Sequence, residues 1–242
     1  MRPQPASVVL FDLDDTIFAH TAAVRAGVDA HRRAHGGAMA AADESAEFAR
    51  WTALEEHHYH RYLRGELAYL DMRRARARGF VEPYGLDLGD DAVADEWFSR
   101  YLIEYAKAWK LHDDTVPMLD ALGGRRFGII TNAELEFQLG KLRALRVTGR
   151  FEHVIASGEV GAAKPDARIF AHAASVFGVA VSECVYVGDR LHTDAIGAVD
   201  AGMRGIWIDR PGRATAEELA EAASRGVDVI GSLAELPSLL QA

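Results

Sequence analysis

The sequence predicts an α/β fold, with a Rossmann-like parallel sheet as the core and an α-helical domain inserted into it. Two observations support this prediction. From about residue 113 onward, short apolar runs alternate with helical segments, as is typical of a parallel sheet covered by helices on both faces. Between residues 18 and 112 the pattern is helical instead, rich in Ala, Arg, Glu and His. We therefore predict a core of residues 1–17 and 113–242 and an inserted helical domain of residues 18–112.

The strands of the core are predicted from its apolar runs. The first run, residues 7–11, is a short apolar run like the others of the core and is assigned to it, although the helical domain follows it. The later strands are predicted at residues 127–131, 153–156, 184–187, 205–208 and 227–230, with helical segments between them that include residues 136–145, 166–177 and 194–201. In the inserted domain, glycine and proline punctuation indicates four or five helices.

The composition is that of a globular protein with a net negative charge. Of the 242 residues, 49% are apolar and 26% are charged, so the chain can bury a core in one large domain or two small ones. The net charge of −9 makes nucleic acid a poor candidate for a partner, because the overall field repels anions. A phosphate would have to be bound by a local site.

No feature of the sequence predicts export or a membrane partner. No apolar run reaches the roughly 18 residues of a membrane span, and residues 1–5 lack the apolar segment of a signal peptide. We therefore expect a soluble, cytoplasmic protein. The single cysteine, Cys184, excludes an internal disulfide and a cysteine-rich zinc site. Because apolar residues follow it, we expect a buried and unreactive thiol.

Two acidic residues end the first predicted strand. Asp12 and Asp14 follow the apolar run, and alternation along a strand would place both side chains on the same side. Two carboxylates this close are costly unless a cation holds them or one is protonated. One interpretation is a metal-dependent site in which one acid is a nucleophile. The other is that Asp14, Asp15 and Thr16 cap the helix that follows.

Polar residues also follow the later strands of the core. Because ligands of open parallel sheets bind beyond the carboxyl ends of the strands, we expect these residues on one rim. Carboxylates are hard ligands for Mg²⁺, a hydroxyl can hold a phosphate oxygen and a lysine offsets its charge. The set therefore suits a phosphoryl group, although a surface lysine, a helix cap and a strand end would each be ordinary alone. Its members are Thr131, Asn132, Lys164, Asp189 and Asp194.

The order of these motifs resembles the haloacid dehalogenase superfamily of hydrolases. The matching segments are Asp12-Leu13-Asp14-Asp15-Thr16, then Thr131, then Lys164-Pro165, and finally the Gly-Asp-Arg-Leu-His-Thr-Asp sequence of residues 188–194. Together they span the core from end to end. The inserted helical domain resembles the cap of this superfamily in position and helical character. Such a cap closes over the site and supplies contacts for specificity.

The resemblance implies a role for each motif residue. Asp12 would be the nucleophile that becomes phosphorylated. Asp14 would be the general acid for the leaving group and afterwards the base for water. The phosphoryl oxygens would be bound by Thr131, Asn132 and Lys164.

The resemblance also implies a Mg²⁺ ion as cofactor. Its ligands would be Asp12, the backbone carbonyl of Asp14 and Asp189, with Asp194 either a direct ligand or just behind the ligands. A carboxylate can attack phosphorus only if its own charge and that of the phosphate are screened, which Mg²⁺ and Lys164 would do.

We accordingly predict a Mg²⁺-dependent phosphomonoester hydrolase that acts through an aspartyl-phosphate intermediate. The substrate would be a small phosphorylated metabolite, of the nucleoside monophosphate, sugar phosphate or phosphoglycolate type. Within the superfamily, an acid at Asp14 favours phosphate esters over haloacids, and Thr16 favours a phosphatase over a phosphomutase. The alternatives are a phosphomutase, a haloacid dehalogenase and, from a different class, a phospho-receiver switch. The sequence predicts no oligomeric state.

Two groups of residues in the helical domain invite a binding interpretation. His57 and His60 are one helical turn apart, but without a cysteine or a matching acid nearby they favour a partly solvated helix face over a metal site. A run of arginines could grip an anion, although neighbouring acids again favour a solvated charged face. These arginines are Arg73, Arg74, Arg76 and Arg78.

Overall fold

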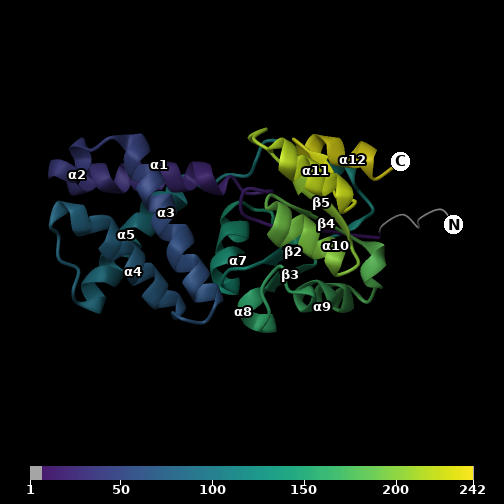
Figure 1. Ribbon diagram of the computed structural model, residues 1–242, viewed down its shortest axis with the longest axis horizontal. Coiled ribbons are helices and arrows are strands. Elements are labelled where there is room, and N and C mark those ends of the chain that lie inside the picture. The colour runs from purple at the N-terminus through teal and green to yellow at the C-terminus, as the bar shows by residue number, and fades with distance from the viewer. Residues whose placement is uncertain (1–6, 242) are drawn as a thin grey trace. The chain divides into compact units, whose positions relative to one another are not determined.

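The computed structural model describes residues 7–241 and divides into two compact units (Figure 1). The core unit runs up to Ala19 and again from Lys110 onward, and the helical unit is His20–Trp109. The predicted inserted domain, residues 18–112, is thus slightly longer than the helical unit. Residues 1–5, for which the sequence predicts no signal peptide, lie outside the described residues.

The core unit is built on a six-stranded parallel sheet with the order β3-β2-β1-β4-β5-β6. Each predicted strand is present within one residue of its predicted bounds, so the predicted α/β fold is confirmed. The strands are β1 (Val8–Phe11), β2 (Arg126–Thr131), β3 (His153–Ala156), β4 (Cys184–Gly188), β5 (Arg204–Ile208) and β6 (Asp228–Ile230).

β1 lies where the chain order of the strands reverses. From β1 the chain builds β2 and β3 outward on one side, and it then returns to build β4, β5 and β6 on the other. In open parallel sheets, ligands bind at such a switch point, outside the carboxyl ends of the strands. Asp12 directly follows β1 and Asp189 directly follows β4, so both lie where a ligand site is expected.

Helices connect the strands of the core unit, and a last one follows β6. Over residues 7–241 they are α6 (Thr115–Ala121), α7 (Leu135–Ala144), α8 (Ser157–Val160), α9 (Ala167–Phe177), α10 (Gly197–Asp200), α11 (Ala216–Ser224) and α12 (Leu236–Leu239). The predicted helix at residues 194–201 is only partly right. A π-helical turn, Leu191–Ile196, comes first, because the N–H of Ala195 donates to the carbonyl of Arg190, five residues back.

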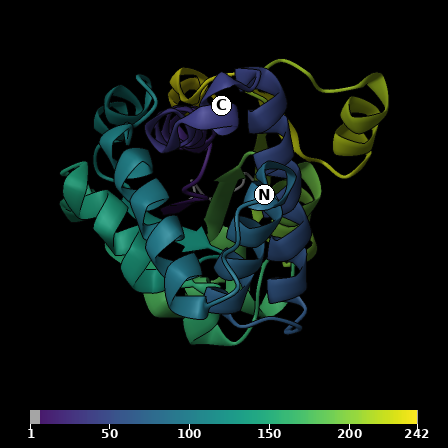
Figure 2. The same ribbon diagram turned by 90° about the vertical axis from the view of Figure 1, so that its left-hand side faces the viewer.

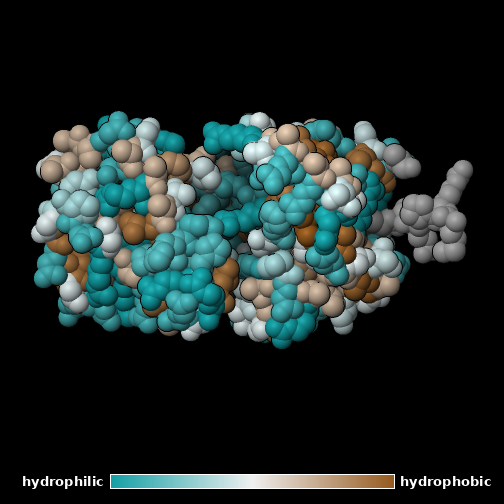
Figure 3. Space-filling view, in the orientation of Figure 1, coloured by the Kyte–Doolittle hydropathy of each residue, from teal (hydrophilic) through white to brown (hydrophobic). Residues whose placement is uncertain are grey.

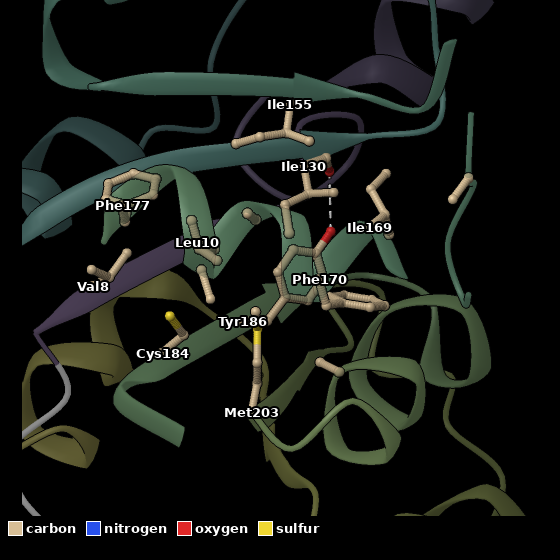
Figure 4. Close-up of a cluster of buried hydrophobic side chains, with 14 residues drawn as sticks. Val8, Leu10, Ile130, Ile155, Ile169, Phe170, Phe177, Cys184, Tyr186 and Met203 are labelled. Carbon is tan, nitrogen blue, oxygen red and sulfur yellow. Dashed lines mark hydrogen bonds between the residues drawn. The ribbon is translucent and has the colours of Figure 1, made fainter. Parts of the chain in front are cut away.

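The sheet is buried on both faces. On one face, Phe170 and Phe177 of α9 pack in a cluster with Leu10 of β1 and Tyr186 of β4 (Figure 4). On the other face, the ring centroid of Phe11 lies 6.2 Å from that of Phe127 in β2. Burial on both faces explains why the strands are continuous apolar runs instead of alternating patterns.

Two glycines mark places where the sheet has no room for a side chain. A Cβ on Gly128 of β2 would lie 2.7 Å from the ring of Phe177. A Cβ on Gly205 of β5 would lie 2.2 Å from the carbonyl oxygen of Ala195 in the π-helical turn. The second contact holds this turn, which carries Asp194, tightly against the sheet.

The helical unit contains five helices, within the predicted range (Figure 2). Its centre is aromatic: Trp51 is fully buried, with its ring centroid 4.4 Å from that of Tyr101 and 5.0 Å from that of Phe80. Such burial of large rings stabilises the unit itself. The helices are α1 (His20–His35), α2 (Gly37–Ala41), α3 (Glu44–Leu63), α4 (Tyr69–Val81) and α5 (Asp91–Lys107).

The charged residues singled out in the helical unit are engaged within it. His57 and His60 are exposed, and His60 lies 2.9 Å from Glu56. In residues 7–241, no group of three or more His, Cys, Asp or Glu side chains is arranged to hold a metal ion. Each arginine has an acidic or aromatic partner: Arg73 lies over Phe98, Arg74 pairs with Asp95, Arg76 with Glu55 and Arg78 with Asp91.

The surface of the protein is mixed (Figure 3), and its lone thiol is buried as expected. Hydrophobic residues lie mostly singly among hydrophilic ones on the face drawn in Figure 3. No helix formed by residues 7–241 is both long and apolar enough to cross a bilayer. Cys184 is buried, and burial raises the pKa of its thiol to about 11, which keeps it protonated and unreactive at neutral pH.

Three contacts hold the segments of the core unit that flank residues 20–109. The N–H of Ala19 donates to the carbonyl of Lys110 at 3.0 Å. Beyond β5, the Arg210 guanidinium donates to the carbonyl of Thr16 at 2.6 Å and pairs with the Asp114 carboxylate at 2.9 Å. Both flanking segments are therefore fastened to the loop after β5.

Candidate active site

Asp12 is held at the end of β1 by the backbone of the neighbouring strand. Its N–H donates to the carbonyl of Val187 in β4 at 2.8 Å, which continues the parallel pairing of the two strands. Alternation along the strand places its side chain on the same face as Leu10. The residue is only 8% exposed, which is unusual for an aspartate.

The Lys164 ammonium lies at the centre of the site. It donates to Asp12 Oδ1 at 2.6 Å, to Asp194 Oδ1 at 2.7 Å and to the Tyr186 hydroxyl at 2.7 Å. An ammonium has three N–H donors, so these three acceptors use all of them. Lys164 is 4% exposed and is therefore not the surface lysine of the alternative interpretation.

The Tyr186 hydroxyl holds the Lys164 ammonium in place. Its hydroxyl accepts from Lys164 and lies 3.1 Å from the carbonyl of Ile130, to which it can donate (Figure 4). The hydroxyl thus connects the ammonium to the backbone of β2.

Asn132 positions Lys164 through its backbone. The Asn132 side-chain amide donates to the carbonyl of Lys164 at 2.9 Å, and its oxygen accepts from the Lys164 N–H at 2.8 Å. The side chain of Asn132 thus joins the end of β2 to the segment that carries the lysine. The peptide bond between Lys164 and Pro165 is cis.

Asp14 is partly exposed and is held by α7. The side chain of Asp14 is 30% exposed. Its Oδ1 accepts from the Lys141 ammonium at 2.6 Å, and its Oδ2 accepts from the Gln138 amide at 3.1 Å. The same amide nitrogen lies 2.9 Å from the hydroxyl of Thr131, at the end of β2. Asp15 makes the turn after Asp14, with a left-handed φ of 59°.

Asp194 is fixed within the turn that follows β4. Its Oδ2 accepts from the N–H of Arg190 at 3.0 Å, while its Oδ1 accepts from Lys164. A Cβ on Gly188 would lie 2.4 Å from the Asp194 side chain, so only glycine fits between β4 and this carboxylate. The carbonyl of Asp189 accepts from the Trp207 indole at 2.9 Å.

The crowded carboxylates change the ionisation of the site. Burial raises the pKa of Asp12 to about 7, with Lys164 opposing the shift and Asp194 adding to it. Burial, together with the charge of Asp12, raises the pKa of Asp189 well above its ordinary value. Burial alone would lower the pKa of Lys164, but the charges of Asp12 and Asp194 outweigh it and raise that pKa. The lysine stays charged between two acids.

The donor set at this rim fits a hard divalent cation. Asp12 and Asp189 supply carboxylate oxygens near enough for the charge of one to raise the pKa of the other. Repulsion of this kind is relieved when a cation lies between the two groups. Since residues 7–241 hold no cluster of three acidic or imidazole side chains, such a cation would also take oxygens from the backbone or from water. Asp14, whose backbone carbonyl is a predicted ligand, lies three residues beyond the end of β1.

The sheet order and the acids at the strand ends define a Rossmann-like α/β protein with a ligand site at the switch point of its sheet. More particularly, the chain belongs to the haloacid dehalogenase-like hydrolases, whose family model matches residues 6–202. The predicted superfamily is confirmed.

Three similar proteins illustrate the relationship. The chain is 33% identical over 135 residues to an N-acylneuraminate-9-phosphatase of Mus musculus, covering 54% of this chain and 52% of that one. It thus spans about half the length of that relative. It is 31% identical to a glyceraldehyde 3-phosphate phosphatase of Methanopyrus kandleri, covering 84% and 83% of the two chains. A magnesium-bound HAD-hydrolase of Bacillus subtilis, YfnB, has the same fold, with a TM-score of 0.80, 18% identity and 99% and 100% coverage.

Three side chains that hydrogen-bond to predicted side chains were not themselves predicted. Tyr186 lies within an apolar run and was counted only as part of a strand. Gln138 and Lys141 lie on a helical segment for which no role was predicted. Their spacing of three residues places both on one face of α7, which is the only signal in the sequence that they act together.

Proposed function

We propose that this protein is a Mg²⁺-dependent phosphomonoester hydrolase that uses Asp12 as its nucleophile. The observation that supports the proposal most strongly is the Lys164 ammonium held between Asp12 and Asp194 at the switch point of the sheet. A fixed positive charge beside a buried carboxylate suits the attack of that carboxylate on an anionic phosphate.

In the first half of the reaction, an oxygen of Asp12 bonds to phosphorus and the bond from phosphorus to the ester oxygen breaks. Protonated Asp14 gives its proton to that oxygen, which leaves as an alcohol. Lys164 offsets the negative charge on the phosphoryl oxygens, and the Thr131 hydroxyl helps to hold them. The product on the enzyme is an aspartyl phosphate at Asp12.

In the second half, Asp14 acts as a base. Its carboxylate takes a proton from a water molecule while the water oxygen bonds to phosphorus. The bond between phosphorus and Asp12 then breaks, which restores the carboxylate and releases inorganic phosphate. Asp14 ends protonated and ready for the next ester.

The metal ion would be held by the carboxylates of Asp12 and Asp189 and by the backbone carbonyl of Asp14. When bound, Mg²⁺ supplies charge that screens the nucleophile from the phosphate. Asp194 is better placed to support Lys164 than to bind the ion, since its two oxygens accept from Lys164 and from the N–H of Arg190.

Asp14 separates this proposal from the alternatives. A haloacid dehalogenase needs no proton donor for an alkoxide, so an acid held at this position favours phosphate esters. Membership of a hydrolase family disfavours the phospho-receiver switch. A phosphomutase needs the same acid, and Thr16 is the residue that argues against it.

We propose a phosphorylated sugar or sugar acid as the substrate, within the wider class of small phosphorylated metabolites. The support comes from two relatives, which are named as phosphatases of N-acylneuraminate 9-phosphate and of glyceraldehyde 3-phosphate. Nucleoside monophosphates and phosphoglycolate are the comparison substrates.

The test is a phosphate-release assay over these compounds and p-nitrophenyl phosphate, with and without EDTA and then with added Mg²⁺. We expect Asp12→Asn to lower turnover by at least about 10³-fold and Asp14→Asn by about 10²–10⁴-fold. The matched control is Asp15→Asn, because asparagine tolerates the left-handed turn and the residue has no assigned role.

Turnover by Asp12→Asn near the wild-type rate would remove the nucleophile from the proposal. Full activity in EDTA would remove the metal ion. Chloride release from 2-chloropropionate without any phosphatase activity would favour the dehalogenase alternative.

A further inference from the structure

Lys141 is a buried lysine outside the sequence motifs. Its side chain is 1% exposed, although the other basic residue of α7, Arg143, lies in solvent. Taking an ammonium out of water costs several kcal/mol unless acceptors replace the water. A buried pair of this kind is weak evidence for stability, because apolar residues of the same size often serve as well. Its presence therefore suggests another role.

The surroundings of Lys141 restrict where its ammonium can point. The nitrogen lies 4.6 Å from the ring centroid of Phe18 and 5.2 Å from that of Phe137. Aromatic faces attract a cation and leave it little freedom. The ammonium reaches the Asp14 carboxylate at 2.6 Å, and at 1% exposure it has no surface for a substrate.

Gln138, one turn earlier on α7, holds the other oxygen of the same carboxylate. Because a carboxylate only accepts hydrogen bonds, the amide nitrogen of Gln138 must face Asp14, and it also meets Thr131. Gln138 is fully buried, and its Oε1 has no hydrogen-bond partner among the described residues. A buried acceptor without a partner is costly, so this orientation is maintained by the contacts to Asp14 and Thr131.

We propose that Lys141 and Gln138 are positioning residues that orient the Asp14 carboxylate for proton transfer. This inference rests on the proposed function, in which Asp14 is the acid and base. Both oxygens of Asp14 are fixed from one rigid helix, and a proton-transfer group must lie within hydrogen-bond reach of its target in a defined direction. Without the two residues, a carboxylate that is 30% exposed could rotate into solvent.

The experiment compares Lys141→Met with the wild type on two aryl phosphates. Phenyl phosphate has a leaving group that needs a proton, whereas that of 2,4-dinitrophenyl phosphate does not. We expect kcat/KM for phenyl phosphate to fall about 10- to 100-fold and that for 2,4-dinitrophenyl phosphate to change far less. KM for phenyl phosphate should stay within about threefold, since Lys141 does not touch the substrate.

A double-mutant cycle tests whether Lys141 acts through Asp14. In an Asp14→Asn background, Lys141→Met should change kcat/KM less than about twofold, because the group it orients is already inactive. Lys141→Arg, which retains a charged donor, should recover part of the activity. The matched control is Arg143→Met on the same helix, whose exposed pairing with Glu136 has no role in the site.

The outcomes separate the inference from the function beneath it. Lys141 has only a structural role, and the inference is wrong, if Lys141→Met lowers kcat/KM equally for both aryl phosphates. The same holds if the fold-losses in kcat/KM of Lys141→Met and Asp14→Asn multiply in the double variant. If Asp14→Asn alone leaves phenyl phosphate hydrolysis intact, the proposed role of Asp14 fails instead. Should Lys141→Met not fold, Gln138→Met gives the same tests, with the same signs expected.

Discussion

At the scale of single residues, the buried ammonium of Lys164 links stability to the site. Its three acceptors, Asp12, Asp194 and Tyr186, are all buried, and two of them carry negative charge. Removing the lysine would strand two carboxylates away from water, whereas removing the tyrosine hydroxyl would free one donor. Loss of the Lys164 charge should therefore destabilise the protein more than loss of the Tyr186 hydroxyl.

We expect Lys164→Met to lower the free energy of unfolding by about 3–5 kcal/mol and Tyr186→Phe by about 1–3 kcal/mol. Urea denaturation of the Mg²⁺-free protein measures both. A smaller loss for Lys164→Met than for Tyr186→Phe would contradict the charge-centred description of the site.

The sequence predicts that the motif residues lie close together, but it does not predict the residues that hold them in place. Asp12 and Lys164 follow strands, and parallel strands end at one rim, so their proximity follows from the fold class. Tyr186 is hidden because a tyrosine fits an apolar strand as well as any large residue. Lys141 is hidden because a lysine on a helix usually marks the exposed face, and only packing shows that this one points inward.

At the scale of elements, close packing between β5 and the turn that carries Asp194 decides what substitutions are tolerated. The sequence predicted one regular helix at residues 194–201, since periodicity alone does not distinguish a wider turn. The structure instead places the carbonyl of Ala195 against Gly205, and this contact depends on the missing side chain. The π-helical form of this turn is therefore determined by its packing against β5 and not by the local sequence pattern.

Two glycine substitutions test this packing. Gly205→Ala places a Cβ 2.2 Å from the Ala195 oxygen, and we expect it to destabilise the protein by about 1–3 kcal/mol. Gly140→Ala is the control within α7, where nothing lies within 4 Å, and it should be neutral or stabilise by up to about 1 kcal/mol. Thermal unfolding midpoints measure the difference, and equal midpoints would contradict the close approach.

At the scale of the whole molecule, the two units need not respond alike to pH. His31 is buried in the helical unit, with its ring 4.4 Å from that of Trp97 and its Nε2 unpaired among the described residues. Burial lowers the pKa of His31 to about 4, from an ordinary value of 6.5, and the nearby charge of His35 adds to the shift. The unfolded chain therefore binds a proton between these pH values that the folded one does not.

Because the folded pKa of His31 is lowered, its contribution to stability is present above pH 6.5 and is lost as the pH falls toward 4. The unfolding midpoint of wild-type protein should thus drop between pH 7.5 and pH 5 by more than that of a His31→Phe variant. Circular dichroism at both pH values measures this, and parallel drops would show that His31 is not the group responsible.

The hydrogen bond between Ala19 and Lys110 has an architectural consequence. It joins the residues that bracket the entire helical unit, so the chain leaves and re-enters the core at a single point, as it would in a hairpin. A segment inserted there can be lengthened, shortened or exchanged without shifting the register of any strand. Selection can therefore alter the helical unit while the sheet edge of the core unit is inherited unchanged.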